Sequence, residues 1–230
     1  MKYKVIIFDF NGVLLWDAPL HVQAWQATAL RLRGSPLSDD EFSIHVHGRT
    51  NSYILGYLSG HSLRETELLE LIQVKESMYR DLCLKNPEMF VLSPGAEALL
   101  DLVSSKDIPR TIATASEKTN LDFFVQHLGL DKWFDLQRIV YDDGTLPGKP
   151  APDMYAKAAG NIGLLPHECV VVEDAISGFQ SAQAANIGHV VGLGPLETHN
   201  RLLGCQGVST VIASFEQFPL ELLVNAWLDN

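Results

Sequence analysis

The sequence predicts an α/β fold in which a parallel sheet carries helices between its strands and an all-helical unit is inserted after the first strand. Three observations lead to this prediction. Short apolar runs rich in β-branched residues recur along the chain, amphipathic patterns lie between them, and one stretch near the N-terminus contains helical patterns alone. Strands that alternate with helices form parallel sheets through right-handed crossovers.

The expected strands are nearly continuous apolar runs, which is typical of strands that are covered on both faces. The first run spans residues 4–10, with the sequence KVIIFDF. Four further strands are expected at residues 110–115, 169–173, 189–192 and 210–213.

Two segments between these strands have the periodicity of helices. In residues 117–130 the apolar side chains recur with the i, i+3, i+4, i+7 spacing of one helix face. A second helix contains Met154 and Ile162 and is expected to stop at Gly163 and Pro166.

The stretch after the first strand breaks the alternation of strands and helices. One apolar stripe includes Trp25 and Ala29, another includes Ile72 and Tyr79, and no buried strand is expected between them. We therefore expect an α/β core of residues 1–16 and 88–230 and a helical unit of residues 17–87.

Composition limits the classes of partner. The formal net charge of −11 argues against a broad nucleic-acid interface, because phosphate backbones require a basic face. Local cations and a metal ion can still bind a small phosphorylated metabolite. The three cysteines form no CxxC pair, and no apolar stretch approaches the roughly 18 residues of a membrane helix. We expect a cytoplasmic monomer without a nucleic-acid or membrane partner.

The residues that carry chemistry gather where the predicted strands end. In an open parallel sheet, ligands bind beyond the carboxyl ends of the strands. The first strand delivers an aspartate, the second a hydroxyl cluster, a loop presents a lysine, and a later strand ends in two acidic residues. The residues concerned are Asp9, Asn11, Thr114, Ala115, Lys149, Glu173 and Asp174.

This set of side chains suits magnesium-dependent phosphoryl transfer. Carboxylate oxygens, water and a substrate phosphate are the ligands that Mg²⁺ prefers. A carboxylate nucleophile needs the metal and Lys149 to offset its repulsion from an incoming phosphate dianion. Thr114 and the backbone N–H groups that follow it can hold phosphate oxygens. The pattern indicates Asp9 as the nucleophile.

Four ordered motifs resemble those of the haloacid dehalogenase superfamily, in the branch of β-phosphoglucomutase and related sugar-phosphate phosphatases. The family's Asp-x-Asp-Gly-Val/Thr motif corresponds to DFNGV at residues 9–13. Its strand ending in Ser or Thr corresponds to Thr114, and its lysine to Lys149 within GKPAPD. Its acidic pair corresponds to Glu173 and Asp174 within EDAISG. The resemblance spans nearly the whole chain and implies a Rossmann-like core with an inserted helical cap of the C1 type.

The resemblance also implies roles for individual residues. Asp9 would form an aspartyl-phosphate intermediate, and Thr114, Ala115 and Lys149 would bind the transferring phosphoryl group. Mg²⁺ would be held by Asp9, the backbone carbonyl of Asn11, Glu173 and Asp174. The cap residues that match this branch are His21, Trp25, Gly48 and Arg49. For His21 and Trp25 a packing role is equally open. His45 and His47 are spaced like a metal pair but lack a third ligand nearby, which favours solvated or structural histidines.

Asn11 departs from the family pattern. The family's second aspartate is the general acid and base, and a neutral amide cannot transfer a proton. Because such help is worth about 10²–10⁴-fold, slow turnover is expected, while magnesium binding through the backbone carbonyl should survive. Asn11 is either native or a replacement of the kind made to trap a ligand. A second departure is Trp16-Asp17-Ala18, where this branch has Asp-Ser-Glu.

Three functions fit these motifs. The first is a phosphatase of a small phosphorylated metabolite, which the partial match of the cap favours. The second is a phosphomutase of the β-phosphoglucomutase type. The third is a non-catalytic phosphometabolite-binding protein, which Asn11 suggests.

Overall fold

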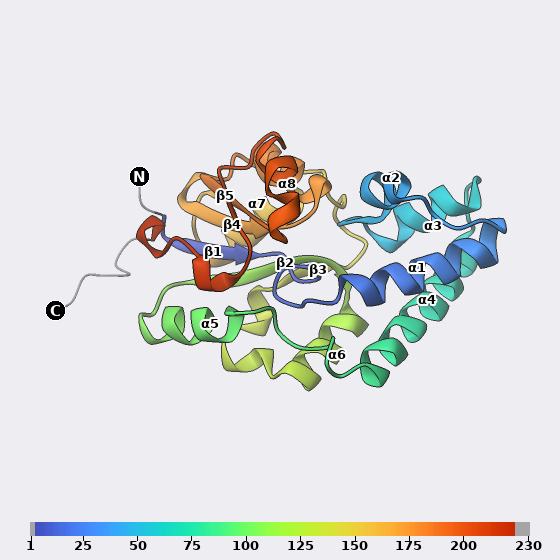
Figure 1. Ribbon diagram of the computed structural model, residues 1–230, viewed down its shortest axis with the longest axis horizontal. Helices are drawn as coiled ribbons and strands as arrows, with labels where there is room; N and C mark the ends of the chain where they lie inside the picture. Colours follow the sequence, from blue (N-terminus) through green and yellow to red (C-terminus); the bar gives the residue numbers. More distant parts are fainter. Residues whose placement is uncertain (1–2, 224–230) are drawn as a thin grey trace.

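The computed structural model describes residues 3–223 and shows a six-stranded sheet in that part of the chain. All neighbouring strands pair in parallel, in the order β3-β2-β1-β4-β5-β6 (Figure 1). The strands are β1 (Val5–Phe8), β2 (Arg110–Glu117), β3 (Val140–Asp142), β4 (Cys169–Glu173), β5 (His189–Leu193) and β6 (Thr210–Ile212). The predicted parallel sheet is confirmed, and Asp9 follows its central strand.

Helices cover both faces of the sheet. The core helices are α5 (Ala96–Ser105), α6 (Lys118–Leu128), α7 (Asp153–Ile162), α8 (Ile176–Ala184) and α9 (His199–Leu203). Short 3₁₀ turns lie at Leu130–Lys132, Leu136–Arg138, Pro166–Glu168, Leu196–Thr198, Phe215–Gln217 and Leu220–Leu222. In Figure 1, α5 and α6 lie below the sheet, and α7 and α8 lie above it.

The strands are apolar on both sides because each face has its own core. Consecutive residues of a strand point to opposite faces of the sheet. Ile6 and Phe8 pack in one apolar cluster with side chains of α5 and α6. Val5 and Ile7 pack in another with side chains of α7 and α8. This explains the unbroken apolar run of the first predicted strand.

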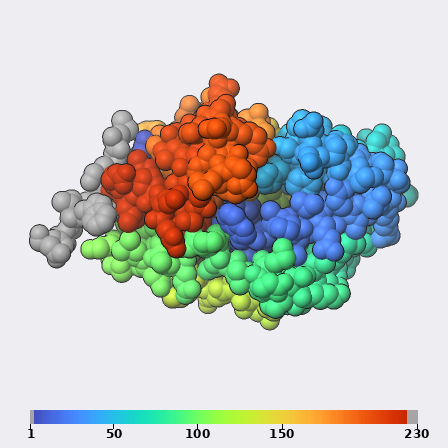
Figure 2. Space-filling model, viewed as in Figure 1, coloured from blue at the N-terminus to red at the C-terminus, as the bar shows by residue number. Residues whose placement is uncertain are grey.

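Between β1 and β2 the described chain contains helices and no strand of the sheet. The insertion consists of α1 (Ala18–Arg33), α2 (Asp39–Glu41), a π-helical turn (Phe42–Val46), α3 (Asn51–Ser59) and α4 (Glu65–Lys85). It has an apolar cluster of its own, which includes Trp25, Ile54 and Leu58. In Figure 2 the insertion, in blue to cyan, packs directly against the core. The predicted all-helical insertion in an α/β core is confirmed.

The structure adds one strand that the sequence pattern does not predict. β3 has three residues and lies at the edge of the sheet, so it lacks the long apolar run of a strand buried on both faces. The five expected strands are present. Residues 1–2 and 224–230, the ends of the predicted core, lie outside the described residues.

The three cysteines are unpaired, with Cys83 and Cys169 buried and Cys205 partly exposed. None of the helices described between residues 3 and 223 has both the length and the apolar character needed to cross a bilayer.

Candidate active site

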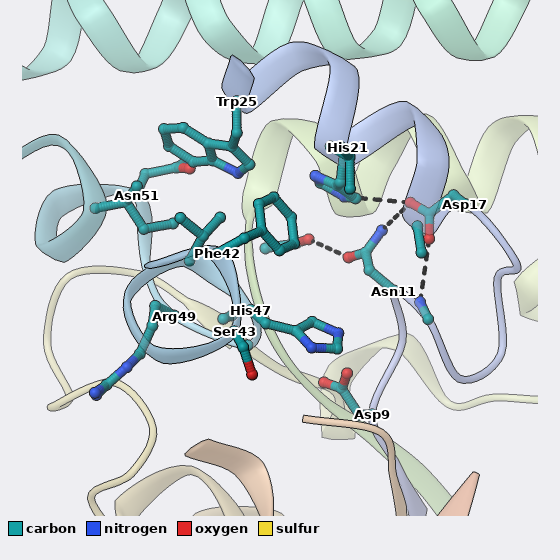
Figure 3. Close-up of a pocket in the computed structure, with 18 of the residues that line it drawn as sticks. Asp9, Asn11, Asp17, His21, Trp25, Phe42, Ser43, His47, Arg49 and Asn51 are labelled. Carbon is teal, nitrogen blue, oxygen red and sulfur yellow. Dashed lines mark hydrogen bonds and ion pairs between the residues drawn. The ribbon is translucent and has the colours of Figure 1, made fainter. Parts of the chain in front are cut away.

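A cavity of about 330 Å³ lies between the core and the helical insertion. The core contributes Asp9, Asn11 and Thr114 to its lining, and the insertion contributes Trp25 and Phe42. Figure 3 shows Asp9 at one end of the cavity and Trp25 at the other. Because ligands of open parallel sheets bind at this edge, this cavity is the candidate active site.

Lys149 joins two carboxylates, one of which, Asp9, lines the cavity while Lys149 and Glu173 lie buried behind it. Its Nζ lies 2.6 Å from Oδ1 of Asp9 and 2.8 Å from Oε2 of Glu173. The side chains of Lys149 and Glu173 are fully buried, and Asp9 is 5% exposed. A buried charge without a partner is strongly destabilising, so these three groups depend on one another.

Both carboxylate oxygens of Glu173 are engaged within the protein. Oε1 accepts hydrogen bonds from the backbone N–H groups of Asp174 and Ala175, each at 3.0 Å. Oε2 accepts from Lys149 and from the hydroxyl of Tyr155 at 2.5 Å. A Cβ at position 178 would lie 1.9 Å from this oxygen, so Gly178 makes the room that Glu173 needs. Glu173 therefore anchors Lys149.

Asp174 has one paired oxygen and one open oxygen. Its Oδ2 lies 2.9 Å from Nε2 of His47, which comes from the insertion. Its Oδ1 is buried and has no hydrogen-bond partner among the described residues. The loop after β1 passes so close that a Cβ at Gly12 would lie 2.0 Å from Oδ2, and Gly12 has the positive φ that favours glycine. A cation would satisfy the open oxygen, which is costly to leave buried.

The donor atoms fit a hard divalent cation. Carboxylate oxygens of Asp9, Glu173 and Asp174 all lie within 4.8 Å of one another. Such oxygens are the protein ligands of Mg²⁺. Asp9 and Asp174 fit as direct ligands, whereas the oxygens of Glu173 are already used by internal donors. The cluster matches the predicted acidic site, with Glu173 in a supporting position.

One lysine charge cannot keep both of its carboxylate neighbours ionised. Burial, followed by repulsion from Glu173, raises the pKa of Asp9 to about 8 despite the attraction of Lys149. Burial also opposes the ionised form of Glu173, but Lys149 outweighs it and holds the pKa of Glu173 below its usual value. Without a metal, burial and the repulsion from Glu173 therefore favour the protonated form of Asp9.

His47 carries a positive charge into the same site. Burial opposes its charged form, but attraction to Asp174, and then to Glu173 and Asp9, raises its pKa to about 9. The hydroxyl of Ser177 in α8 donates to the backbone carbonyl of His47 at 2.9 Å. The loop that carries His47 is therefore attached to the core at two points. Figure 3 shows the imidazole directed toward the end of the cavity that holds Asp9.

Asn11 lies in a hydrogen-bonded cluster with Asp17. Its Nδ2 donates to Oδ2 of Asp17 at 2.7 Å and to the hydroxyl of Tyr79 at 3.2 Å. Its Oδ1 accepts from the hydroxyl of Ser116 at 2.7 Å. Tyr79 also donates to Oδ2 of Asp17, and Nε2 of His21 lies 3.2 Å from the same oxygen (Figure 3).

The end of β2 forms the side of the cavity beside Asn11. Thr114 is buried, and its hydroxyl oxygen accepts from the backbone N–H of Ser116 at 3.1 Å. This bond lies in the irregular last part of β2, where Thr114, Ala115 and Ser116 all line the cavity. Hydroxyl and backbone N–H groups at such a strand end can bind phosphate oxygens.

The predicted cap residues lie at the other side of the cavity. Trp25 is buried, and Nζ of Lys75 lies 4.4 Å from the centre of its ring. His21 stacks on Tyr79 with ring centres 4.0 Å apart. Arg49 donates to the backbone carbonyl of Lys149 at 3.0 Å, and its side chain points away from Asn11 (Figure 3).

The structure brings most of the predicted site residues to one cavity. Those that line it are Asp9, Asn11, Thr114, Ala115, His21, Trp25, Gly48 and Arg49. Lys149, Glu173 and Asp174 lie next to Asp9.

Sequence reasoning missed three residues of the site: Asp17, His47 and Lys75. Asp17 and Lys75 line the cavity with no matching motif, and His47 was favoured as a solvated or structural histidine. Ser116 belongs to the hydroxyl cluster that was expected at the end of the second strand. Asp17 could have been found from the sequence, because positions 11 and 17 both differ from the family pattern. They carry an amide donor and a carboxylate acceptor that can pair with each other. His45, by contrast, stacks on Tyr57 away from Asp174.

Comparisons with known proteins agree on one family. Residues 3–186 match the family model of the haloacid dehalogenase-like hydrolases. The chain is 30% identical over 225 residues to hexitol phosphatase A of Escherichia coli, with 96% of this chain and 95% of that protein covered. It is 27% identical over 237 residues to β-phosphoglucomutase of Bacillus subtilis, with 97% and 95% covered. A haloacid dehalogenase hydrolase of family IA, variant 3, from Entamoeba histolytica has a similar structure, with a TM-score of 0.84, 36% identity and coverage of 98% and 99%.

Proposed function

This chain belongs to the haloacid dehalogenase-like hydrolases and is a phosphatase, and from that premise we propose that it hydrolyses a small sugar-phosphate-like metabolite through Asp9. The observation that carries this proposal is the floor of the cavity. There a carboxylate at the end of the central strand meets Lys149 at 2.6 Å, beside the open oxygen of Asp174. Each partner is one that a carboxylate nucleophile needs before a phosphate dianion can approach.

Asp9, Asp174 and the backbone carbonyl of Asn11 would hold Mg²⁺, and Glu173 would support them through Lys149. When bound, the ion offsets negative charge on the phosphoryl oxygens and on Asp9. Because the pKa of Asp9 is raised to about 8, this effect would also favour the ionised form that attacks.

In the proposed reaction, the carboxylate of Asp9 attacks phosphorus as the bond to the leaving oxygen breaks. Lys149 and residues 114–116 at the end of β2 would hold the phosphoryl oxygens of the resulting aspartyl-phosphate. Water would then attack phosphorus, release inorganic phosphate and regenerate Asp9. The leaving oxygen gains a proton and the attacking water loses one. The amide of Asn11 can do neither, so we expect slow turnover.

The insertion, which we assign as a cap of residues 17–87 over the core of residues 1–16 and 88–230, favours hydrolysis over phosphomutation. A mutase must accommodate a second phosphate at the distal end of the cavity. There Lys75 is paired with Glu76 at 3.0 Å. Arg49 is engaged with the carbonyl of Lys149 and with the ring of Tyr53. Trp25 offers an apolar face of the kind that packs against a sugar ring.

The test is phosphate release with and without Mg²⁺ on sugar monophosphates, nucleotides, pyrophosphate and p-nitrophenyl phosphate. We expect slow, magnesium-dependent turnover of sugar monophosphates that Asp9→Asn reduces to the buffer rate while thermal unfolding stays close to the native value. Asp40→Asn, an exposed carboxylate of α2, is the matched control and should retain the native rate. Turnover that survives in Asp9→Asn would refute the assigned nucleophile. Isomer formation that requires a sugar bisphosphate primer would favour the mutase, and ligand binding without turnover would favour the binding protein.

A further inference from the structure

The two departures of this chain from the family pattern meet in space. Position 11 carries an amide where the pattern has a carboxylate, and position 17 carries a carboxylate where the pattern has a small hydroxyl residue. In the structure Nδ2 of Asn11 lies 2.7 Å from Oδ2 of Asp17. The carboxylate thus stands at position 17 in place of position 11, and it is hydrogen-bonded to the amide that replaces it at position 11.

Asp17 occupies a site built for an ionised carboxylate. Its side chain is fully buried. Oδ1 accepts from the backbone N–H of Gly12 at 3.1 Å, and Oδ2 accepts from Asn11 and Tyr79. Nε2 of His21 lies 3.2 Å from Oδ2. A buried carboxylate with this number of donors is a fixed element of the site.

An amide at position 11 is the complement of this carboxylate. Since the ionised oxygens of Asp17 can only accept, they fix the Asn11 amide with Nδ2 toward Asp17 and Oδ1 toward the hydroxyl of Ser116. An aspartate at position 11 would place a second, partly buried carboxylate within hydrogen-bond distance of the fully buried Asp17. Two carboxylates at that distance repel each other when both are ionised.

Asp17 and the carbonyl of Leu15 together hold the peptide unit between residues 11 and 12. In a trans peptide the N–H and C=O groups point in opposite directions, and the one cis peptide among the described residues is elsewhere. Because the Gly12 N–H donates to the carbonyl of Leu15 at 2.8 Å and to Oδ1 of Asp17 at 3.1 Å, the carbonyl of Asn11 points away from both acceptors. This carbonyl is the backbone ligand assigned to the metal. Gly12 itself lies against Asp174, since a Cβ there would be 2.0 Å from Oδ2.

We propose that Asn11 and Asp17 act as one unit, in which Asp17 is a positioning residue that orients the Asn11 amide and the Asn11–Gly12 peptide for the metal and substrate. Through Tyr79 the same carboxylate connects the loop of the nucleophile to α4 of the cap. Asn11 is thus the residue that this site requires, and an aspartate cannot simply be restored there. The proposal rests on the proposed function for its kinetic readout and for the metal assigned to the Asn11 carbonyl, whereas the Tm cycle is independent of both.

The test is an exchange cycle of the native protein, Asn11→Asp, Asp17→Asn and the double variant. Thermal unfolding is measured for all four in EDTA, and Mg²⁺ binding by calorimetry. We expect Asn11→Asp alone to lower Tm by about 4 °C or more, because it sets a partly buried carboxylate against the fully buried Asp17. The double variant, which again pairs one amide with one carboxylate, should recover at least half of that loss. Asp40→Asn, which removes an exposed cap carboxylate, should leave Tm within about 1 °C.

The positioning role has its own readout. We expect Asp17→Asn, which keeps the shape of the side chain, to weaken Mg²⁺ binding by about tenfold, as changes behind a metal ligand typically do. Its kcat with p-nitrophenyl phosphate should fall and recover in the double variant. Additive Tm effects across the cycle, or an unchanged Kd for Mg²⁺ in Asp17→Asn, would overturn the proposal. So would an Asn11→Asp variant as stable as the native protein and at least tenfold faster. If no variant turns over any phosphate ester, the proposed function fails. The Tm cycle and the Mg²⁺ titration still decide whether Asn11 and Asp17 act as one unit.

Discussion

Lys149 donates to both Asp9 and Glu173, and this sharing decides the charge state of the nucleophile. Removing the ammonium would leave Glu173 ionised and buried with Tyr155 and two backbone N–H groups as its remaining donors. Breaking a buried ion pair from one side is costly, because the partner's charge stays behind without compensation. The residue that binds substrate phosphate is therefore also a residue that stabilises the fold.

We predict that Lys149→Met lowers the free energy of unfolding by about 3–5 kcal/mol and abolishes turnover. Denaturant unfolding at neutral pH measures the first effect. Lys132→Met is the matched control, since Lys132 forms exposed pairs with Glu97 and Asp101 and should change stability by less than about 1 kcal/mol. Equal losses in the two variants would show that Lys149 contributes no more than a surface lysine.

At the residue scale, the sequence predicts which side chains reach the site when they belong to a recognisable motif at the end of a strand. Asp9, Thr114 and Lys149 lie where the pattern of strands requires them, because parallel strands present their carboxyl ends at one edge. His47 and Asp17 were not predicted, since their roles depend on how the insertion docks onto the core. Docking is a long-range contact, and no local spacing encodes it. Glu173 was expected to bind metal directly, and only its contacts reveal that its oxygens are used elsewhere.

At the scale of elements, α4 joins the cap to the core through a buried polar cluster. Glu76 of α4 accepts from Asn51 at 2.7 Å and from Asn120 of α6 at 2.6 Å. Arg80, one turn further along α4, donates to Oδ1 of Asn120 at 2.7 Å. The amide of Asn120 therefore donates to Glu76 and accepts from Arg80, both in α4. A carboxylate at this position could accept from Arg80 but could not donate to Glu76.

We predict that Asn120→Asp loosens the cap without unfolding the core, because it sets a carboxylate against the buried Glu76. Hydrogen exchange followed by mass spectrometry should show faster exchange in α4, with β1 and β4 unchanged. KM for a sugar phosphate should rise more than kcat falls, since cap residues line the cavity. Asn200→Asp in α9 makes the same chemical change at an exposed position and should leave α4 exchange unchanged. Unchanged α4 exchange in Asn120→Asp would show that this cluster does not hold the cap.

The elements themselves follow from the sequence to the extent that they bury a regular pattern. The run of residues 4–10 is apolar throughout because β1 is covered on both faces, and the structure shows both covering clusters. β3 has no such run, since it is an edge strand of three residues. The insertion was predicted because its apolar stripes have helical spacing and bury a separate cluster.

For the whole molecule, stability and metal binding are linked through the carboxylates of the site. In the metal-free protein the pKa of Asp9 is raised from 3.8 to about 8 by burial and then by Glu173, and that of His47 is raised from 6.5 to about 9. Both groups bind more protons in the folded state than in the unfolded state across these intervals. The stability that they contribute is present at low pH and is lost as the pH rises.

We predict that Tm in EDTA falls as the pH rises from about 6.5 to 8. In this interval both groups hold a proton in the folded protein that they release on unfolding. Saturating Mg²⁺ should raise Tm and reduce the fall, because a ligand that binds only the folded state stabilises it. His47→Asn should flatten part of the slope in EDTA, and Asp174→Asn should abolish the gain from Mg²⁺. A Tm that rises with pH in EDTA would contradict these charge assignments.

The loop after β1 has a consequence for the timing of events. Only eight residues separate Asp9 from Ala18, the first residue of α1, and two of them, Asn11 and Asp17, are bonded to each other. The segment that connects the cap to the core is thus also the segment that surrounds the nucleophile. A rotation of the cap about this segment would also move Asn11 and Gly12. We expect the reactive groups to reach their final positions only when the cap closes over a substrate. Water that enters without a substrate would then not meet a correctly arranged site. The loop would therefore couple substrate binding under the cap to the positioning of the groups that cleave the phosphate ester.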